Sequence, residues 1–216
     1  MAWRMLVRRC PTRSFTVVGD VAQTSSLAGA RSWKGMLDPV FRDAWRLAEL
    51  TVNYRTPASV ADAARRAALA AGLPVSPLTS ARDVEDALRV VEVAPDDLRA
   101  RVRAEAEAAR TEFVAAESGR VAVVAAEPSL PALRAALDLD DAGPDAPVVL
   151  LDPVQVKGLE FDAVVLVEPA DVATGPSGAS DLYVAMTRPT RRLVVVHARA
   201  LPAGVVDTGA STARET

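Results

Sequence analysis

The chain has 216 residues, half of them apolar, and a formal net charge of −3, so it can bury a sizeable core but presents no overall basic surface for nucleic acid. Its single cysteine, Cys10, and single histidine, His197, exclude a disulfide framework and speak against a protein-bound zinc ion. No apolar run approaches the roughly 20 residues of a membrane span, and the arginine-containing start is not a signal peptide. We therefore expect a globular protein of the cytoplasm, without membrane contacts and without a metal site.

The first part of the chain predicts three elements. Trp3, Met5, Leu6 and Val7 are typical of the end of a packed helix, as if the chain opened within a domain. The run Phe15–Val18 predicts a buried strand, which Gly19 and Asp20 stop. The apolar residues between Trp33 and Phe41 have the spacing of one helix face, and Pro39 predicts a break within that helix.

A strand and a helix are predicted next. The strand Leu47–Val52 ends in Asn53-Tyr54-Arg55. Thr56 is then predicted to cap an alanine-rich helix, with Pro57 in its first turn and Gly72 at its end.

The rest of the chain alternates apolar strand patterns with helical patterns. The predicted strands are Leu88–Val93, Val121–Ala125, Val148–Leu151, Ala163–Val167 and Leu193–His197. The predicted helices are Asp96–Ala116, Leu130–Leu137 and one from Asp181 through Thr187 to Arg191, with loops at 73–80, 138–147 and 170–179. This alternation predicts an α/β fold with a mostly parallel sheet and helices on both faces. Residues 199–216 are small and polar, and they predict a flexible tail.

Four polar clusters stand at strand ends or helix starts, where open α/β sheets bind their ligands. In the first, Asp20 and Gln23 offer a carboxylate and an amide, although an ordinary turn that contains an aspartate is an alternative. In the second, the ring of Tyr54 can stack on a planar base and the guanidinium of Arg55 matches phosphate oxygens. A half-buried tyrosine and a surface arginine remain the alternative there.

The third and fourth clusters flank the last two strands. Gly158, in the Lys-Gly-Leu-Glu turn, marks a place where the backbone approaches a ligand or turns sharply, and Glu160 can accept hydrogen bonds from sugar hydroxyls. Arg188 is predicted to point away from the core, because helical spacing puts it on a different face from Tyr183. The following pair, Arg191-Arg192, is interpreted as the cationic end of a helix.

These clusters, in this order, resemble motifs III to VI of the UvrD/Rep-type superfamily 1 helicases. VVGDVAQ is similar to motif III, LTVNYRTP to motif IV, VKGLEFDAVVLVEP to motif V and LYVAMTRPTRRL to motif VI. The resemblance covers nearly the whole chain except the tail. It implies a RecA-like fold of the P-loop NTPase type, with residues 1–44 as the remnant of a first RecA-like domain and 45–198 as the second.

The resemblance also implies that ATP binds between the two RecA-like domains. Gln23 would sense the γ-phosphate, and Arg55 and Arg188 would reach it as arginine fingers. These residue types suit phosphoryl transfer, whose transition state spreads negative charge over the phosphate oxygens. The residues implied in nucleotide binding are Tyr54 against adenine, Glu160 on the ribose, Gly158 in the motif V turn and Asp20 in motif III.

Two motifs of such motors are absent from the chain. It contains no G-x-x-x-x-G-K-[ST] phosphate loop and no acidic pair after an apolar strand to hold magnesium. We therefore expect the C-terminal part of a longer motor, truncated or encoded in a separate reading frame, whose missing N-terminal RecA-like half binds Mg²⁺. The isolated chain is expected to hydrolyse little or no ATP.

Departures from the helicase pattern refine the expected partner. Val154 occupies the position at which DNA-unwinding members carry a histidine, and residues 24–27 (Thr-Ser-Ser-Leu) replace the aromatic residues that stack on bases. The run at 29–33 and the VKGLEFD sequence are closer to HelD-type motors, which use ATP to release and recycle RNA polymerase. The expected partners are thus the missing half and either RNA polymerase or DNA. A non-catalytic RecA-like binding module and a degenerate helicase remnant are the alternatives.

Overall fold

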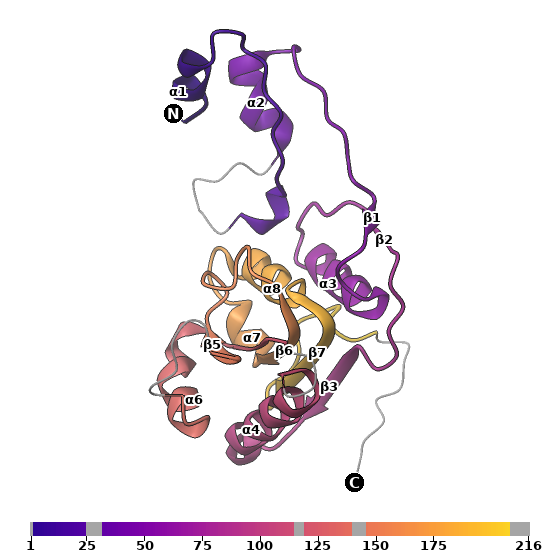
Figure 1. The fold of residues 1–216 in the computed structure, drawn as a ribbon, viewed down its shortest axis with the longest axis vertical. Coiled ribbons are helices and arrows are strands. Elements are labelled where there is room, and N and C mark those ends of the chain that lie inside the picture. The colour runs from indigo at the N-terminus through magenta and orange to yellow at the C-terminus, as the bar shows by residue number, and fades with distance from the viewer. Residues whose placement is uncertain (1, 25–31, 115–118, 140–145, 208–216) are drawn as a thin grey trace.

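The computed structural model describes residues 2–24, 32–114, 119–139 and 146–207, and it confirms the predicted α/β fold. Its centre is a sheet of five parallel strands in the order β3-β7-β6-β4-β5 (Figure 1). The strands are β3 (Leu88–Glu92), β4 (Val121–Val124), β5 (Val148–Leu151), β6 (Phe161–Val167) and β7 (Pro189–His197). All five strands predicted from Leu88 onwards are thus present. Their near-continuous apolar sequences are typical of strands covered on both faces.

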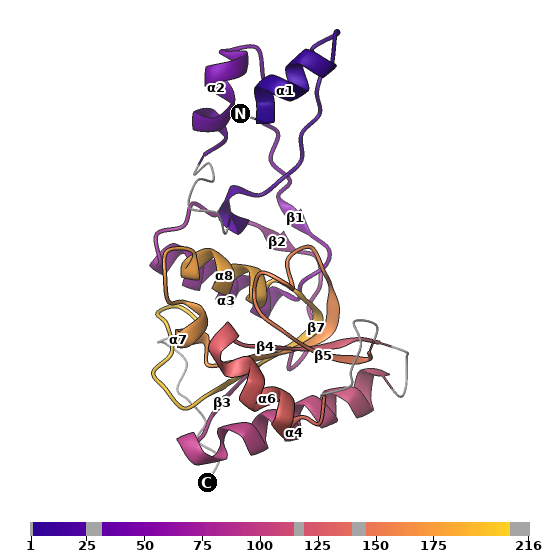
Figure 2. The ribbon, with the colours of Figure 1, turned by 90° about the vertical axis from the view of Figure 1, so that its left-hand side faces the viewer.

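Helices cover both faces of this sheet, which makes three layers (Figure 2). On one face lie α3 (Ala58–Ala70), α7 (Pro169–Val172) and α8 (Gly178–Met186). On the other face lie α4 (Leu98–Ala109) and α6 (Leu130–Ala136). Two separate hydrophobic cores result, and β6 contributes alternate residues to each: Val164 packs towards α3 and α8, and Val165 towards α4 and α6.

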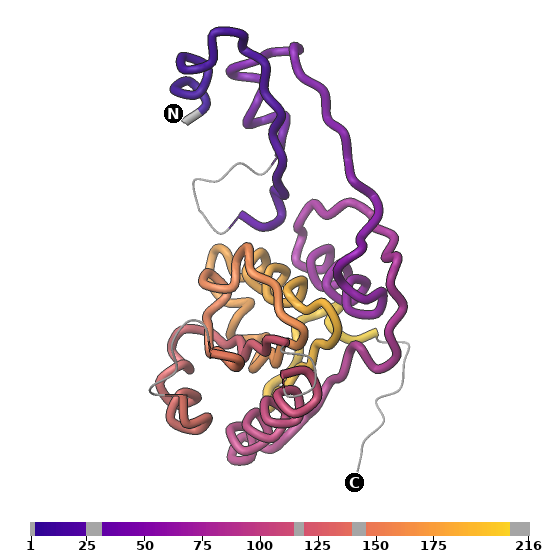
Figure 3. Tube along the Cα trace, in the orientation of Figure 1, coloured from indigo at the N-terminus to yellow at the C-terminus, as the bar shows by residue number. Residues whose placement is uncertain are grey.

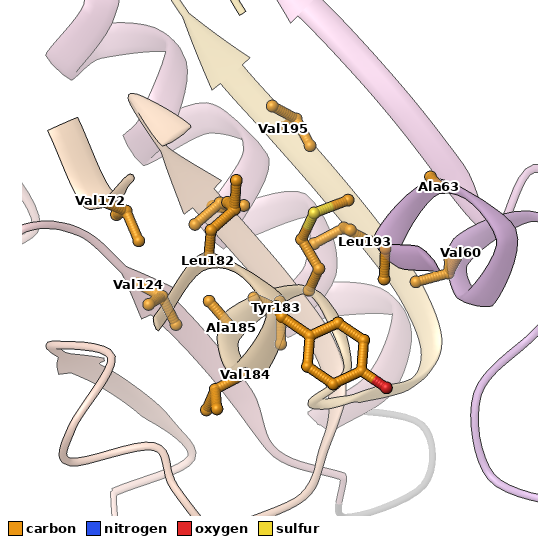
Figure 4. Close-up of a cluster of buried hydrophobic side chains, with 14 of the residues drawn as sticks. Val60, Ala63, Val124, Val172, Leu182, Tyr183, Val184, Ala185, Leu193 and Val195 are labelled. Atoms are coloured by element: carbon orange, nitrogen blue, oxygen red, sulfur yellow. The ribbon is translucent and has the colours of Figure 1, made fainter. Parts of the chain in front are cut away.

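The core beneath α3 and α8 is built largely of small and β-branched residues (Figure 4). Val60 and Ala63 of α3 face Leu193 of β7, and all three are fully buried. Helix α8 is apolar on most sides, because every residue from Leu182 to Met186 is buried. It therefore holds the segment that follows it in a fixed position above β6 and β7.

The N-terminal part stands apart from the sheet and is joined to it by two extended segments (Figure 1, Figure 3). It contains α1 (Ala2–Arg9), a short 3-10 helix η1 (Val21–Gln23) and α2 (Trp33–Phe41). An aromatic cluster joins α1 to α2: the ring of Phe41 lies 6.1 Å from Trp3 and 5.7 Å from Phe15, in edge-to-face geometry. Only η1 of these elements reaches the α8 side of the sheet.

Both strands predicted before residue 53 are wrong in whole or in part. Phe15–Val18 is extended but forms no strand, and Val18 is 85% exposed. Of Leu47–Val52, only the last residue belongs to β1 (Val52–Asn53), which pairs with β2 (Thr79–Ser80). A strand needs a neighbour for its backbone hydrogen bonds, and among the described residues no strand lies beside 15–18.

Three helix boundaries also differ from the predictions. Helix α2 continues through Pro39 to Phe41. Pro57, and not Thr56, is the N-cap of α3, and no side chain caps the helix there. In the turn before it, the Asn53 side chain accepts the N–H groups of Arg55 (3.0 Å) and Thr56 (3.2 Å). The loop predicted at 170–179 contains most of α7.

The helix predicted up to Arg191 ends at Met186, since Pro189 cannot continue it, and the chain enters β7. Arg191 and Arg192 are therefore not a cationic helix end. They lie on β7 over the ring of Phe113, and Arg192 forms an ion pair with Glu112.

The first residues of the predicted tail pack against α3. Val205 is fully buried, and Gly204 sits so close to the backbone of Arg66 that a Cβ atom would lie 2.6 Å from its carbonyl carbon. Residues 25–31 and 208–216 lie outside the described residues, as do residues 115–116 at the end of the predicted long helix. The segment 25–31 includes most of the runs 24–27 and 29–33, which were compared with helicase sequences. Within the described ranges, no helix has both the length and the apolar character to cross a membrane.

Candidate functional site

All four polar clusters meet at one edge of the sheet. β6 and β7 are neighbouring parallel strands, and Phe161 pairs with Pro189 at their starts. The residues just before these strands, Glu160 and Arg188, are therefore placed side by side. This is the amino edge of the sheet, whereas open α/β sheets bind ligands beyond the carboxyl ends of their strands. The expectation that these residues lie at the edge where open α/β sheets bind ligands is therefore wrong, although the residues do converge.

Arg55 approaches this edge from the turn before α3. Its Nη1 donates to Glu160 Oε1 at 2.8 Å and its Nη2 donates to the carbonyl oxygen of Thr187 at 3.0 Å. The Arg55–Glu160 pair is partly exposed, with 35% and 55% of the side chains accessible. Arg55 Nε is buried and has no hydrogen-bond partner. This guanidinium is consequently oriented by two other elements but is not fully satisfied.

Arg188 is the most buried charged group of the cluster, at 2% exposure. Its guanidinium donates to the carbonyl oxygens of Val184 (Nε, 2.9 Å) and Leu159 (Nη1, 3.4 Å), and to Gln23 Oε1 (Nη2, 3.3 Å) and Thr187 Oγ1 (Nη2, 3.0 Å). The prediction that Arg188 points freely away from the core is therefore wrong. Arg188 directly follows the C-cap of α8, and its bond to the Val184 carbonyl turns the side chain back over the end of this helix.

The charge of Arg188 is maintained in this position. Burial, and next the positive charge of Arg55, lower the pKa of Arg188 to about 10, while Glu160, Tyr183 and Asp20 act in the opposite direction. A pKa near 10 leaves the guanidinium charged at neutral pH. Burial, followed by the negative charge of Asp20, raises the pKa of the Tyr183 phenol, which therefore stays protonated.

The side-chain amide of Gln23, on η1, makes hydrogen bonds through both its nitrogen and its oxygen. Asp20 caps this short helix by accepting the Ala22 N–H at 2.9 Å, and its other oxygen accepts Gln23 Nε2 at 2.9 Å. With the amide nitrogen occupied in this way, the amide oxygen faces Arg188. Lys157 donates to the backbone carbonyl of Gln23. Gln23 thereby joins the N-terminal part of the chain to Arg188 and to the turn that contains Lys157 and Gly158.

Gly158 and Tyr54 have different surroundings. Gly158 adopts φ +81° with no atom within 4 Å of the position a Cβ would take, so glycine serves the sharp turn and not a close backbone contact. Tyr54 is 73% exposed. Among the described residues no ring contact involves it, so its face is accessible for stacking.

Four residues shape the site that were not singled out from the sequence. Thr187 and Lys157 make the contacts described above. Asp152 Oδ1 accepts the N–H groups of Val154 (2.7 Å) and Gln155 (2.9 Å), which fixes the turn before β6, and Asn53 does the same before α3. An aspartate or asparagine just before a turn can be recognised from the sequence as a residue that fixes the turn, and Asp152-Pro153 and Asn53 both fit this pattern.

The cluster gathers positive charge in a protein that is negative overall. Lys157, Arg55 and Arg188 bring three positive charges together, and among the described residues the carboxylates that face the two arginines are Asp20 and Glu160. Two guanidinium groups with an exposed aromatic ring nearby can bind a polyanion that also carries a planar group. No three residues of the metal-binding types (His, Cys, Asp, Glu) gather in the part of the chain that the structure describes.

The cavities do not coincide with this cluster. One of about 350 Å³ lies at the carboxyl edge of the sheet, between Leu98, Leu133 and Val167, and none of the predicted site residues lines it. A much smaller one, of about 20 Å³, adjoins the cluster at Tyr183, Thr187 and Asn53. The converging charged groups, and not a cavity, therefore define the candidate site.

Comparison with known proteins places the fold. No protein-family model matches the chain, and no curated protein sequence matches it. Among solved structures, the chain is similar to the C-terminal domain of a possible DNA helicase from the Lactobacillus strain WCFS1, with a TM-score of 0.53 and 18% identity over 73% of this chain and 96% of that one. The helicase of PRRSV covers 73% of this chain with 24% of its own, at 16% identity and a TM-score of 0.38, which is too low to support an argument. The chain thus has the RecA-like α/β fold of a helicase C-terminal domain.

Proposed function

We propose that this chain is the ATP-binding C-terminal portion of a superfamily 1 helicase-like motor ATPase. The observation that carries the proposal is the convergence of Arg55, Arg188 and Gln23 from three separated motifs, with one guanidinium 2% exposed and still charged. A buried cation is costly to maintain unless its charge is used or fully paired. The similarity in fold to a helicase C-terminal domain supports the same class.

In this proposal the two arginines contact the γ-phosphate and stabilise the charge that develops as it is transferred. Such an arginine finger can contribute about 10³–10⁵ in rate. Gln23 then reports the presence of the γ-phosphate to the N-terminal part, because its amide oxygen bonds Arg188 and its carbonyl bonds Lys157. Asp20 and Gly158 act indirectly, by orienting Gln23 and by forming the turn that carries Lys157 and Glu160.

The nucleoside would be bound at the exposed side of the cluster. Tyr54 offers its face to adenine, and Glu160 accepts hydrogen bonds from the ribose. Glu160 is paired with Arg55, but a pair this exposed contributes only about 0–1 kcal/mol, so Glu160 can exchange its partner. Magnesium and the β-phosphate would be held by an N-terminal RecA-like half, since this chain carries neither motif.

For the parent motor we place RNA polymerase recycling ahead of DNA unwinding. Val154, at the position of the helicase histidine, is 62% exposed, and Leu159 in the same turn is 38% exposed. Exposed apolar residues beside the site suit contact with another protein better than contact with a phosphate backbone.

The test is a comparison of ATP and ADP binding by isothermal titration calorimetry without added magnesium. We expect the chain to bind ATP about tenfold more tightly than ADP, because only ATP carries the γ-phosphate that the arginines contact. Arg188→Ala should abolish this preference and leave ADP affinity unchanged. Arg99→Ala is the matched control, since Arg99 is exposed and its side chain makes no ion pair or hydrogen bond with the other described residues.

Equal affinities for ATP and ADP in the unmodified chain would refute the proposal. Partner binding that is unaffected by Arg55→Ala and Arg188→Ala would favour the non-catalytic binding module instead.

A further inference from the structure

Thr187 lies between the two arginines and contacts both. Its carbonyl oxygen accepts Arg55 Nη2 at 3.0 Å, and its hydroxyl oxygen accepts Arg188 Nη2 at 3.0 Å. We propose that Thr187 is a positioning residue that holds the Arg55 and Arg188 side chains in one fixed arrangement. Its consequence for nucleotide binding rests on the function proposed above, whereas the positioning itself does not.

The hydroxyl of Thr187 is oriented by the end of α8. Thr187 is the C-cap of this helix, and its backbone N–H donates to the carbonyl oxygens of Tyr183 and Val184. Its Oγ1 lies 2.9 Å from the carbonyl oxygen of Tyr183 and 3.1 Å from that of Val184, and it can only donate its proton to these acceptors. The lone pairs of the hydroxyl are therefore left for Arg188, and the hydroxyl cannot rotate to serve as a donor elsewhere.

Thr187 also accepts hydrogen bonds from two guanidinium groups, those of Arg55 and Arg188, whose positive charges repel each other. Arg55 lowers the pKa of Arg188, which shows that the two guanidinium groups are near enough to oppose each other. Glu160 pairs with Arg55 only, and it is more than half exposed. Two oxygens of a single residue, one directed at each cation, fix the distance between the cations.

The two contacts use different atoms, so substitutions can separate them. Thr187→Val keeps the branched shape and the carbonyl oxygen but removes the hydroxyl. It should release Arg188 and leave Arg55 in place. Thr187→Ser retains the hydroxyl and should preserve both contacts.

The experiment measures phenylglyoxal modification of individual arginines by mass spectrometry, in the full chain and without nucleotide. In the chain without a substitution, Arg188 should react more slowly than Arg99, which is exposed. We expect Thr187→Val to accelerate the reaction of Arg188 with phenylglyoxal about threefold or more, with the rates of Arg55 and Arg99 unchanged. Thr187→Ser should react like the chain without a substitution. An unchanged Arg188 rate in Thr187→Val, or an equal acceleration in Thr187→Ser, would overturn the proposal.

Two further measurements keep the result decisive. If Thr187→Val accelerates all three arginines and so loosens the fold, Thr187→Ala is compared with Thr187→Ser in the same way. In the calorimetric assay, Thr187→Val should lower the preference for ATP over ADP about tenfold. If no variant binds nucleotide while the modification pattern holds, the positioning role stands and the ATPase assignment fails.

Discussion

At the scale of single residues, Arg188 carries its charge in a place where an isolated cation would be unstable. Four acceptors surround it: the carbonyl oxygens of Val184 and Leu159, the Gln23 amide oxygen and the Thr187 hydroxyl. None of them is a carboxylate, so the hydrogen bonds satisfy the guanidinium without cancelling its charge. A satisfied but uncancelled cation is what an anion-binding site requires.

The pH dependence of ATP binding follows from this residue. The pKa of Arg188 is lowered to about 10, so the positive charge is present up to about pH 9 and is lost as the pH rises through 10. We expect the preference for ATP over ADP to be constant between pH 8 and 9 and to fall towards pH 10.5, as measured by calorimetry. Arg188→Gln retains Lys157 and every other titrating group, so a fall of the same size in that variant would contradict the assignment.

At the scale of elements, the segment after β7 is held against α3 although its composition is that of a tail. Gly204 makes this possible: it has φ +87° and lies where a side chain would meet the Arg66 backbone at 2.6 Å. Val205 can then be buried beside Ala67. The close approach of two backbones thus anchors α3 and, through its N-terminal turn, Arg55.

Gly204→Ala should destabilise the protein more than Gly72→Ala. Both glycines have positive φ (+87° and +77°), which costs a residue with a side chain about 1–2 kcal/mol, but only Gly204 has backbone atoms within the contact range. We expect losses of about 1 kcal/mol for Gly72→Ala and at least about 2 kcal/mol for Gly204→Ala in urea unfolding. Equal losses would mean that residues 198–207 do not pack on α3 as described.

At the scale of the whole molecule, the chain presents one side of a proposed nucleotide site and no phosphate loop. Arg55 and the ring of Tyr54 are accessible at the amino edge of the sheet, and Gln23 and the buried Arg188 lie beside them. Catalysis of phosphoryl transfer depends mostly on positioning and charge stabilisation from all sides. In the proposed function, such a one-sided site binds ATP but does not turn it over.

The purified chain should therefore show no ATP hydrolysis above background, even with magnesium, in a phosphate-release assay. Nothing in its sequence cradles the β-phosphate, so the arginines alone have no in-line geometry to stabilise. Turnover that disappears in Arg188→Ala would contradict this expectation, while turnover that persists would indicate a contaminating enzyme.

The sequence alone determined the five strands of the main sheet and most of its helices. Ala163–Val167 is apolar at every position, and Leu193–His197 is apolar at every position except His197, because a parallel strand covered by helices on both faces has no exposed side. The polar clusters could be proposed from the sequence because their order resembles helicase motifs III to VI. Asp20, Gln23, Arg55, Glu160 and Arg188 all belong to these clusters.

Only the tertiary structure decided which of these groups touch one another and at which edge they meet. The order β3-β7-β6-β4-β5 places the starts of β6 and β7 together, and this non-local pairing brings Glu160 beside Arg188 and both beside Arg55. Residues 15–18 have a strand-like sequence but form no strand, because among the described residues they lack a hydrogen-bonding neighbour. Local sequence specifies side-chain chemistry and backbone preference, whereas burial and partners depend on residues distant in the chain.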